Sequence, residues 1–427
     1  MSNNIIIKNS SLRGEITIPP SKSFAHRAVI CASLAKGTST IAPIDLSSDI
    51  NATIHGCMAL GAEISYNSHT KALTIDGSHT GSTKRTEINC SESGSTLRFM
   101  IPVAAALGAD ASFTGEGRLP GRPIDVYANL LPKHGLNCRY SGSLPFHTSG
   151  NLTSGTYCLP GNVSSQFISG LLFALPLCSG NSDIILTTPL ESESYVNITI
   201  EVLKSFGVSV TTTNGGYHIK GGQTYQPCSY AVEGDWSQAA FFISAGAINS
   251  NISIAGLNKA SVQGDARCLE IFKSMGADVQ FENDTLVCRH NHLNPIELDA
   301  SDIPDLVPII AVTAACCNGT SRIYGAGRLR YKESDRLAAI SENMHRLGCD
   351  VSETDDGLII NSKGEFHGGQ IDGFNDHRIV MSFAIAALWA SDDIVISDYT
   401  AINKSYPGFF DDFKRIGGVC DVVNVRK

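Results

Sequence analysis

The chain repeats one pattern six times, and this repeat restricts the fold more than any other feature of the sequence. In each copy a polar turn precedes a helix of small apolar residues, and a second helix ends at a glycine before a strand. Glycine is favoured just past a helix end because it adopts the left-handed conformation without a Cβ clash. The turns lie at Pro20, Gly94, Ser164, Gly234, Asp305 and Asp376, and the glycines that follow them after 41–43 residues are Gly61, Gly135, Gly207, Gly276, Gly348 and Gly417.

This spacing predicts six copies of a strand–helix–strand–helix–strand–strand unit, grouped as two domains of three copies each. The fold class expected is α/β (α+β), with parallel helices buried inside each domain and sheets outside, because the helices are rich in Ala and Ile and poor in charge. We place the first strand, residues 4–8, with the C-terminal half. The expected N-terminal domain is therefore residues 20–234, and the expected C-terminal domain is residues 1–19 together with 235–427.

Composition restricts the partners of the chain. The formal net charge is −9 and charged residues make up only 17% of the 427 positions, which is typical neither of a disordered chain nor of a coiled coil. A net negative chain is a poor general binder of nucleic acid or of an anionic membrane, so neither partner is expected. An anionic small molecule would therefore need a local cationic pocket.

The cysteines and the N-terminal sequence bear on location. The 13 cysteines are scattered, form no CxxC pair, and lie mostly in apolar runs, which predicts free buried thiols in a reducing compartment. The first residues lack the basic and apolar regions of a signal peptide. We expect a cytoplasmic protein, and a monomer.

Several of the six turns carry cations as well as hydroxyls. Serine and aspartate there are explained as ordinary helix N-caps, but Lys22 with Arg27, and His377 with Arg378, oppose the helix dipole. A helix N-terminus also offers unpaired N–H groups to an anion. The turns therefore indicate anionic ligands.

Three loops add further cations. Residues 117–123 carry Arg118 and Arg122 among glycines and prolines, residues 328–336 combine Lys and Arg with Glu333 and Asp335, and Lys404 precedes the last helix. Arginine suits bidentate binding of carboxylate or phosphate. In contrast, His290 and His292 form an isolated HxH motif, which does not predict a zinc site, so no metal is expected. No nucleotide-binding motif occurs, so no cofactor is expected either.

Six motifs that keep their order along the whole chain carry a family resemblance. They are Pro19-Pro20-Ser21-Lys22-Ser23 with Arg27, Gly121-Arg122-Pro123, Ser164-Ser165-Gln166, Lys332-Glu333-Ser334-Asp335-Arg336, Asn375-Asp376-His377-Arg378 and Lys404. Together they resemble the 5-enolpyruvylshikimate-3-phosphate synthases (3-phosphoshikimate 1-carboxyvinyltransferases), which are enolpyruvyl transferases of the shikimate pathway. The resemblance implies two inverse α/β barrel domains of three βαβαββ units each.

The resemblance also implies a reaction. The enolpyruvyl group of phosphoenolpyruvate passes to the 5-hydroxyl of shikimate 3-phosphate by addition and elimination, with release of phosphate and with no metal or organic cofactor. Residues expected at shikimate 3-phosphate are Lys22, Ser23, Arg27, Ser164, Ser165, Gln166, Ser192, Asp305 and Lys332. Residues expected at phosphoenolpyruvate are Lys22, Gly94, Arg122, Gln166, Arg336, Arg378 and Lys404.

Catalysis is expected from Asp305 and Glu333 as proton carriers, with Lys22 beside the reacting centre. The order in which the two carboxylates act stays open, and Asp305 could instead cap a helix. Because the expected residues come from both halves, we expect the free protein to be open and shikimate 3-phosphate to close it.

Two alternatives remain at this stage, and the sequence also departs from the family at some positions. One alternative is the sister enzyme that acts on UDP-N-acetylglucosamine, whose turn has Lys-Asn where this chain has Lys22-Ser23; the other is a non-catalytic repeat scaffold, which leaves the clustered cations unexplained. Residues 92–99, with Phe99 in place of proline, together with Phe167 and Arg328, depart from members that glyphosate inhibits strongly. We therefore expect weak inhibition by glyphosate.

Overall fold

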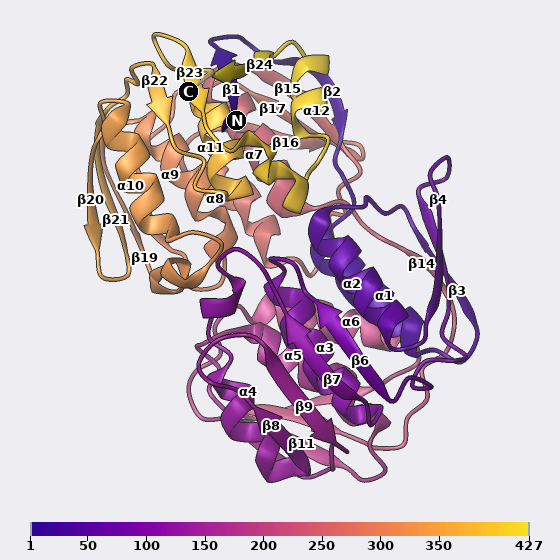
Figure 1. Ribbon diagram of the computed structural model, residues 1–427. Coiled ribbons are helices and arrows are strands. Elements are labelled where there is room, and N and C mark those ends of the chain that lie inside the picture. The colour runs from indigo at the N-terminus through magenta and orange to yellow at the C-terminus, as the bar shows by residue number, and fades with distance from the viewer. Residues whose placement is uncertain (1, 426–427) are drawn as a thin grey trace. The chain divides into compact units, whose positions relative to one another are not determined.

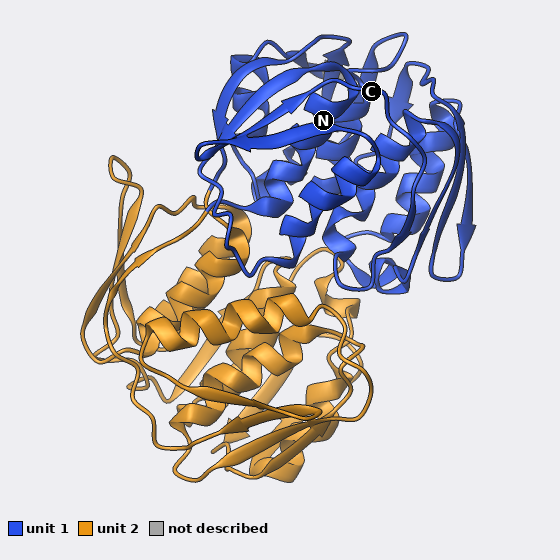
Figure 2. Cartoon of the chain, turned by 180° about the vertical axis from the view of Figure 1, so that it is seen from behind, with its two compact units in different colours: residues 1–19, 234–427 blue, residues 20–233 orange. Residues whose placement is uncertain are grey.

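The computed structural model describes residues 2–425 and divides the chain into two compact units (Figure 2). Unit 1 is residues 1–19 with 234–427, and unit 2 is residues 20–233. Gly234 lies in unit 1, one position away from the division expected from the sequence, and its N–H donates to the carbonyl of Gly256 at 3.2 Å. The ends of the expected C-terminal domain, Met1, Arg426 and Lys427, lie outside the described residues.

Unit 2 contains three sheets of four strands, each with the helices of one repeat. The first repeat comprises β14 (Ser229–Ala231), α1 (Lys22–Leu34), β3 (Thr38–Ala42), α2 (Ser48–Ala59), β4 (Glu63–Asn67) and β5 (Ala72–Asp76). The second comprises β6 (Arg85–Asn89), α3 (Gly94–Ala106), β7 (Asp110–Thr114), η1 (Leu119–Gly121), α4 (Asp125–Leu130), η2 (Leu131–His134), β8 (Leu136–Arg139) and β9 (Phe146–Gly150). The third comprises β10 (Thr156–Leu159), α5 (Ser165–Ala174), η3 (Leu175–Leu177), β11 (Ser182–Leu186), α6 (Glu193–Ser205), β12 (Val210–Thr213) and β13 (Gly216–Ile219).

Unit 1 has the same organisation. The fourth repeat comprises β2 (Arg13–Thr17), α7 (Trp236–Asn249), β15 (Asn251–Ala255), η4 (Gly264–Arg267), α8 (Cys268–Ser274), β16 (Asp278–Glu282) and β17 (Thr285–Arg289). The fifth comprises β18 (Glu297–Asp299), η5 (Pro304–Leu306), α9 (Val307–Ala315), β19 (Asn318–Tyr324), η6 (Gly327–Tyr331), α10 (Arg336–Arg346), β20 (Asp350–Thr354) and β21 (Gly357–Lys363). The sixth comprises β22 (Gly369–Ile371), α11 (His377–Ala386), β23 (Ile394–Ile396), η7 (Tyr399–Lys404), α12 (Phe409–Arg415), β24 (Val419–Val425) and β1 (Ser2–Lys8).

The strands of every sheet follow one order. The first strand of a repeat pairs in parallel with the second, and the last strand lies antiparallel between the second and the third, as in the order β6-β7-β9-β8. Parallel neighbours need a long crossover connection, and a helix supplies it in the second, third, fifth and sixth repeats. The predicted strand–helix–strand–helix–strand–strand unit is confirmed.

Three strands pair in a repeat other than the one whose helices follow them in sequence. β1 pairs with β23 and β24, with Ile5 opposite Ile396, so this strand lies in the sheet of the sixth repeat. β2 pairs with β15 although α1 follows it, and β14 pairs with β3 although α7 follows it. β14, which precedes the helices of the fourth repeat in sequence, therefore supplies the first strand of the first repeat. β2, which precedes the helices of the first repeat, supplies the first strand of the fourth.

The helix that follows each polar turn forms the core of its unit. α1, α3, α5, α7, α9 and α11 are buried over almost their whole lengths, and the sheets lie outside them (Figure 1). Such helices are apolar on all faces because other elements surround them. Buried helices and outer sheets were predicted and are confirmed. The six sheets of the described residues are separate, however, and none closes into a barrel.

Glycine ends the second helix of every repeat as predicted. Gly61, Gly135, Gly207, Gly276, Gly348 and Gly417 have φ between 77° and 106°. At Gly61 a Cβ atom would also lie 2.7 Å from the carbonyl oxygen of His79, so space as well as conformation requires glycine there.

All 13 cysteines are free and most are buried, as predicted. Within residues 2–425, no helix has the length and apolar character needed to cross a membrane.

Candidate functional site

Lys22 is fixed at the start of α1 by a carboxylate from the next helix. Its Nζ lies 2.9 Å from Oδ2 of Asp49, in the first turn of α2, and the two side chains are 19% and 11% exposed. A carboxylate is favoured at that position by the helix dipole. The pair holds the ammonium group at one place with little solvent around it. Sequence reasoning missed Asp49, whose place after two serines reads as an ordinary helix start.

Arg27, one turn after Ser23, is a buried cation that contacts neutral oxygens. Its Nη1 donates to the carbonyl of Ser23 at 2.7 Å, its Nε to Oγ1 of Thr199 at 2.7 Å, and its Nη2 to the carbonyl of Tyr195 at 2.9 Å. Among the described residues no carboxylate pairs with it, and burial lowers its pKa to about 10. A buried cation without a counter-ion is unfavourable unless an anion joins it, which suits a phosphate-binding residue.

The serines expected near Arg27 lie at the starts of α5 and α6. Ser164 accepts the N–H of Gln166 at 3.3 Å as the N-cap of α5, and Ser165 is the buried first residue of that helix. Ser192 precedes α6 with φ 56°, and its side chain makes no capping bond. Oγ of Ser169 lies 2.8 Å from Oγ1 of Thr199, the same atom that Arg27 contacts, so α1, α5 and α6 meet at one point.

Two arginines, Arg98 and Arg122, lie beside Gly94 at the start of α3, and Gln166 contacts the first of them. A Cβ atom on Gly94 would lie 2.8 Å from Nη1 of Arg98 and 3.0 Å from Cζ of Arg122. Gln166 accepts from Nη1 of Arg98 at 2.8 Å and donates to Oγ of Ser95 at 2.9 Å. Glycine thus lets the guanidinium groups approach the helix N-terminus, where an anion is favoured.

The two arginines of the loop at residues 117–123 separate in the structure. Arg122 follows η1 and is buried beside Gly94, whereas Arg118 is exposed. Arg98, which the sequence did not single out for a role, orients Gln166 and donates from Nη2 to the carbonyl of Pro123 at 2.8 Å. Its guanidinium also lies 5.1 Å from the ring of Phe167.

A chain of buried polar groups joins α1, α2 and the first turn of α3. Nδ1 of His26 lies 2.6 Å from Oγ1 of Thr53, which lies 2.7 Å from Oγ1 of Thr96, which in turn donates to Oγ of Ser93 at 2.8 Å. Burial, with Lys22 and Arg27 nearby, holds the pKa of His26 well below 6.5. His26 is therefore a neutral residue that fixes the helix starts around Lys22.

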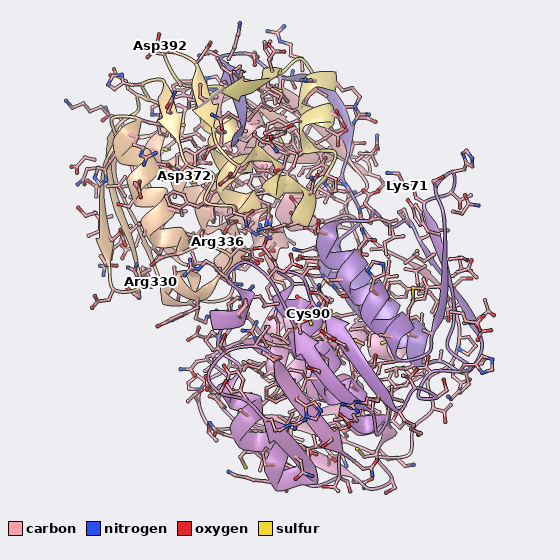
Figure 3. The ribbon with its side chains drawn as sticks, in the orientation of Figure 1. Lys71, Cys90, Arg330, Arg336, Asp372 and Asp392 are labelled. Carbon is pink, nitrogen blue, oxygen red and sulfur yellow. The ribbon has the colours of Figure 1, made fainter. Side chains whose placement is uncertain are left out.

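Unit 1 brings its expected residues together around Arg336 at the start of α10. This side chain, labelled in Figure 3, is 1% exposed. It contacts three carboxylates: Nε lies 2.8 Å from Asp376, Nη1 2.9 Å from Asp305 and Nη2 2.8 Å from Glu333. Burial alone would lower the pKa of Arg336, but the three carboxylates raise it above its ordinary value. Arg336 thus stays charged and holds both candidate proton carriers.

Asp305 is the meeting point of the cations. Its Oδ1 is 2.9 Å from Nη1 of Arg336 and 3.5 Å from Nζ of Lys332, and its Oδ2 is 3.1 Å from Nη2 of Arg378. Asp305 lies in η5, where no side chain makes a capping bond, so the alternative that it caps a helix is not supported.

Arg378 and Lys404 complete this cluster. Nη1 of Arg378 donates to Oγ of Ser237 at 2.6 Å and to the carbonyl of Asp305 at 2.9 Å. Nζ of Lys404, at the end of η7, donates to the carbonyl of Asn375 at 2.6 Å, and the residue is 8% exposed.

Asp376 is a carboxylate that contacts both Arg336 and Arg378. It is fully buried, caps the N–H of Arg378 at 2.9 Å, and accepts from Oγ of Ser334 at 3.0 Å. Burial, the largest single effect, would raise its pKa, but Arg336 and His377 together outweigh burial and the pKa is lowered. Arg330, in the same cationic loop, instead pairs with Asp335 at 3.2 Å and Glu353 at 2.9 Å, away from these residues.

No metal site accompanies these clusters. Over residues 2–425, no group of three or more His, Cys, Asp or Glu side chains is placed to hold an ion. Nδ1 of His290, from the pair of histidines noted above, lies 3.1 Å from the carbonyl of Ala247.

Comparison with known proteins decides the family. The model of the family described as EPSP synthase (3-phosphoshikimate 1-carboxyvinyltransferase) matches residues 6–413. The chain belongs to the EPSP synthase family. It is 44% identical over 433 residues to the 3-phosphoshikimate 1-carboxyvinyltransferase of Clostridium novyi (strain NT), covering 99% of this chain and 100% of that one. With the enzyme of the same name from Clostridium perfringens (strain 13 / Type A) the identity is 44% over 419 residues, covering 97% and 98%.

Solved structures agree. EPSP synthase from Acinetobacter baumannii superposes with a TM-score of 0.84 at 26% identity, covering 99% of this chain and 100% of that one. The enolpyruvyl transferase NikO from Streptomyces tendae, at 16% identity and a TM-score of 0.82 over 100% and 99% of the two chains, shares the fold. The predicted family, fold class and enzyme class are therefore confirmed, and neither the UDP-N-acetylglucosamine enzyme nor a non-catalytic scaffold is favoured.

Proposed function

We propose that the residues around Arg27 and around Arg336 carry out the EPSP synthase reaction in this chain. The observation that carries the assignment is Arg336, a buried guanidinium that contacts Asp305 and Glu333 at 2.9 and 2.8 Å. The reaction needs one group to accept a hydroxyl proton and one to move a proton at the methylene carbon, and this arginine orients two carboxylates for these steps.

Shikimate 3-phosphate is assigned to the Arg27 cluster. Arg27 supplies a buried positive charge, and Ser23, Ser165 and Ser192 supply hydroxyls at helix starts, where N–H groups also favour phosphate. Asp305 and Lys332 are assigned to the sugar-like ring of the same substrate. Ser164 keeps its capping bond and adds a hydroxyl that an anion can also contact.

Phosphoenolpyruvate is assigned to the second set of cations. Arg122 beside Gly94 serves its phosphate at the N-terminus of α3, and Gln166, held by Arg98, orients it. Arg336, Arg378 and Lys404 serve its carboxylate. Several cations are needed because two anions must lie side by side before they react.

Addition and elimination then account for all the atoms. In the addition step, the 5-hydroxyl oxygen bonds to the enol carbon, the hydroxyl proton passes to one carboxylate, and the methylene carbon gains a proton. In elimination, the carbon–oxygen bond to phosphate breaks and the methyl group loses a proton. Asp305 and Glu333 are the proton carriers, and Lys22, held by Asp49, stabilises the charge that develops beside them.

The same assignment bears on the oligomeric state, the location and the cofactor requirement of the protein. Both clusters belong to one chain, so a monomer suffices for catalysis. Free cysteines throughout the described residues support a reducing, cytoplasmic location. No cofactor enters the scheme, because every proton and charge is assigned to a side chain.

Phosphate release from phosphoenolpyruvate tests the proposed function. Shikimate 3-phosphate should support release, whereas shikimate without the phosphate and UDP-N-acetylglucosamine should not. An Arg27→Gln variant should raise KM for shikimate 3-phosphate by about 10- to 100-fold because a charge-assisted contact is lost. Release with UDP-N-acetylglucosamine alone would contradict the substrate assignment.

A further inference from the structure

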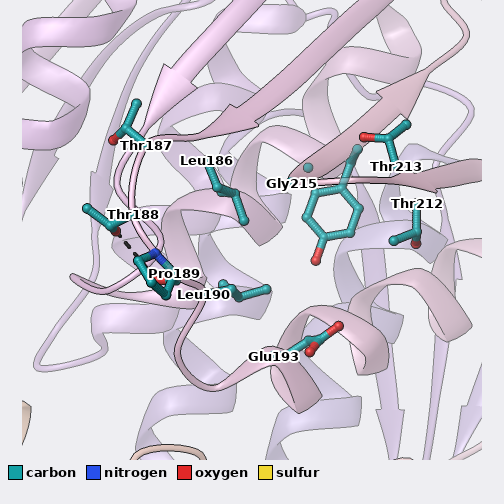
Figure 4. Close-up of a pocket in the computed structure, with 11 residues that line it drawn as sticks. Leu186, Thr187, Thr188, Pro189, Leu190, Glu193, Thr212, Thr213 and Gly215 are labelled. Atoms are coloured by element: carbon teal, nitrogen blue, oxygen red, sulfur yellow. Dashed lines mark hydrogen bonds between the residues drawn. The ribbon is translucent and has the colours of Figure 1, made fainter.

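Unit 2 also contains a hollow that the residues around Arg27 do not line. It has a volume of about 400 Å³ and lies between the loop after β11, the start of α6 and the hairpin of β12 and β13 (Figure 4). Its lining is Leu186, Thr187, Thr188, Pro189, Leu190, Glu193, Thr212, Thr213, Gly215, Gly216 and Tyr217. None of the residues assigned to the reaction lines it.

The hydroxyl group of Tyr217 is accessible from the hollow. Tyr217 is 3% exposed, and within residues 2–425 nothing hydrogen-bonds its hydroxyl group. Burial, together with Glu193, raises its pKa to about 12, so the hydroxyl keeps its proton. A ligand in the hollow can therefore hydrogen-bond this hydroxyl group.

The lining specifies the chemistry of the ligand. Leu186, Leu190 and the ring of Tyr217 offer apolar surface, and Glu193 offers a carboxylate that no other described residue pairs. No lysine or arginine occurs in this lining, so the anionic substrates of the reaction are excluded. An apolar ring that bears an ammonium group fits, since an added carboxylate would be repelled by Glu193.

The wall of the hollow continues into the segments assigned to shikimate 3-phosphate. Oγ1 of Thr188 accepts the N–H of Gly161 at 2.9 Å, in the turn that leads to Ser164. The same loop leads to Ser192, and α6 supplies Tyr195, whose carbonyl binds Arg27. A ligand that moves this wall therefore acts on the groups around Arg27.

We propose that this hollow is a binding site for a small arylalkyl primary amine and that its occupancy changes the affinity of the chain for shikimate 3-phosphate. The second clause rests on the proposed function. Coupling of this kind is reciprocal, so each ligand changes the affinity for the other by the same factor.

Calorimetric titration with 2-phenylethylamine tests the site. The amine should bind with a Kd on the order of 1 mM, as expected for so few atoms, and 3-phenylpropanoate of similar size should not bind. Leu190→Trp, which fills the hollow, should abolish binding. Glu193→Gln should weaken it about threefold or more, while Glu201→Gln, the same change on the exposed face of α6, should leave it unchanged.

Repeating the titration with saturating shikimate 3-phosphate tests the coupling. The Kd of the amine should change about threefold or more in one direction, with the same factor for shikimate 3-phosphate when the amine is saturating. No binding of the amine, or equal binding of the propanoate, would overturn the site, and an unchanged Kd would overturn the coupling. Absence of shikimate 3-phosphate binding would contradict the proposed function, while the first titration would still decide whether the site exists.

Discussion

Replacing Asp376 by asparagine removes the charge on which the Arg336 cluster depends. The carboxylate is 0% exposed and accepts four hydrogen bonds: from Oγ of Ser334 at 3.0 Å, from Nε and Nη2 of Arg336 at 2.8 and 3.3 Å, and from the N–H of Arg378 at 2.9 Å. Asparagine can keep the bond to Arg378. Its amide nitrogen, however, would then face donors of Ser334 and Arg336 in a buried place.

The size of the loss follows from these contacts. Removing one partner of a buried ion pair costs about 3–5 kcal/mol. Arg336 keeps Asp305 and Glu333, so the lower end applies, and we expect Asp376→Asn to lower the free energy of unfolding by about 3 kcal/mol. For a unit of this size that corresponds to a fall in Tm of about 6–12 °C.

Urea and thermal unfolding measure this loss. Asp392→Asn, an exposed change that Figure 3 places on the surface of unit 1, is the matched control and should cost less than about 0.5 kcal/mol. Because the pKa of Asp376 is lowered in the folded state, its stabilising effect is present above its ordinary pKa of 3.8 and is lost as the pH falls below that value. The difference between wild type and variant should therefore shrink in acid. A variant as stable as wild type at pH 7 would refute the reasoning.

Three further outcomes are expected. Lys22→Ala should fold normally but lose at least about 100-fold in turnover, whereas Lys71→Ala, which removes an exposed lysine paired with Asp45 at 2.8 Å, should retain it; equal rates would reject the role of Lys22. Below pH 6.5 His26 binds a proton in the unfolded chain but stays neutral when it is buried in the folded chain, so the free energy of unfolding should fall by about 1.4 kcal/mol per pH unit of acidification. His26→Gln should remove this dependence of stability on pH, whereas His55→Gln, at an exposed position, should not. Solution X-ray scattering should show a smaller radius of gyration with shikimate 3-phosphate, since residues assigned to it come from both units; an unchanged radius would contradict closure.

Local features of the fold could be predicted because they depend on a few neighbouring residues. Glycine ends each second helix for conformational reasons that a single position reveals, and the small apolar residues of the buried helices identify them in the sequence. The exchange of β2 and β14 could not be predicted. It depends on pairing between residues more than 180 positions apart, and β-pairing leaves little local signal.

The site shows the same limit. The motifs identified Lys22, Arg27, Asp305 and Arg336, but the carboxylate that holds Lys22 comes from another helix and depends on how α1 packs on α2. Arg118 and Arg122 are alike in sequence, and only the course of η1 buries one and exposes the other. Arg98 lies within a buried helix, where its contact with Gln166 needs the position of α5.

The most direct measurement follows the carbon that is transferred. Phosphoenolpyruvate labelled with ¹³C at the enol carbon, incubated with the full chain and shikimate 3-phosphate, can be monitored by NMR. The assignment predicts that the labelled signal moves to that of an enol ether bonded to the 5-oxygen of shikimate 3-phosphate, and that Asp305→Asn slows this change while shikimate 3-phosphate still binds. A label that stays in phosphoenolpyruvate, or that appears on UDP-N-acetylglucosamine when both acceptors are present, would contradict it.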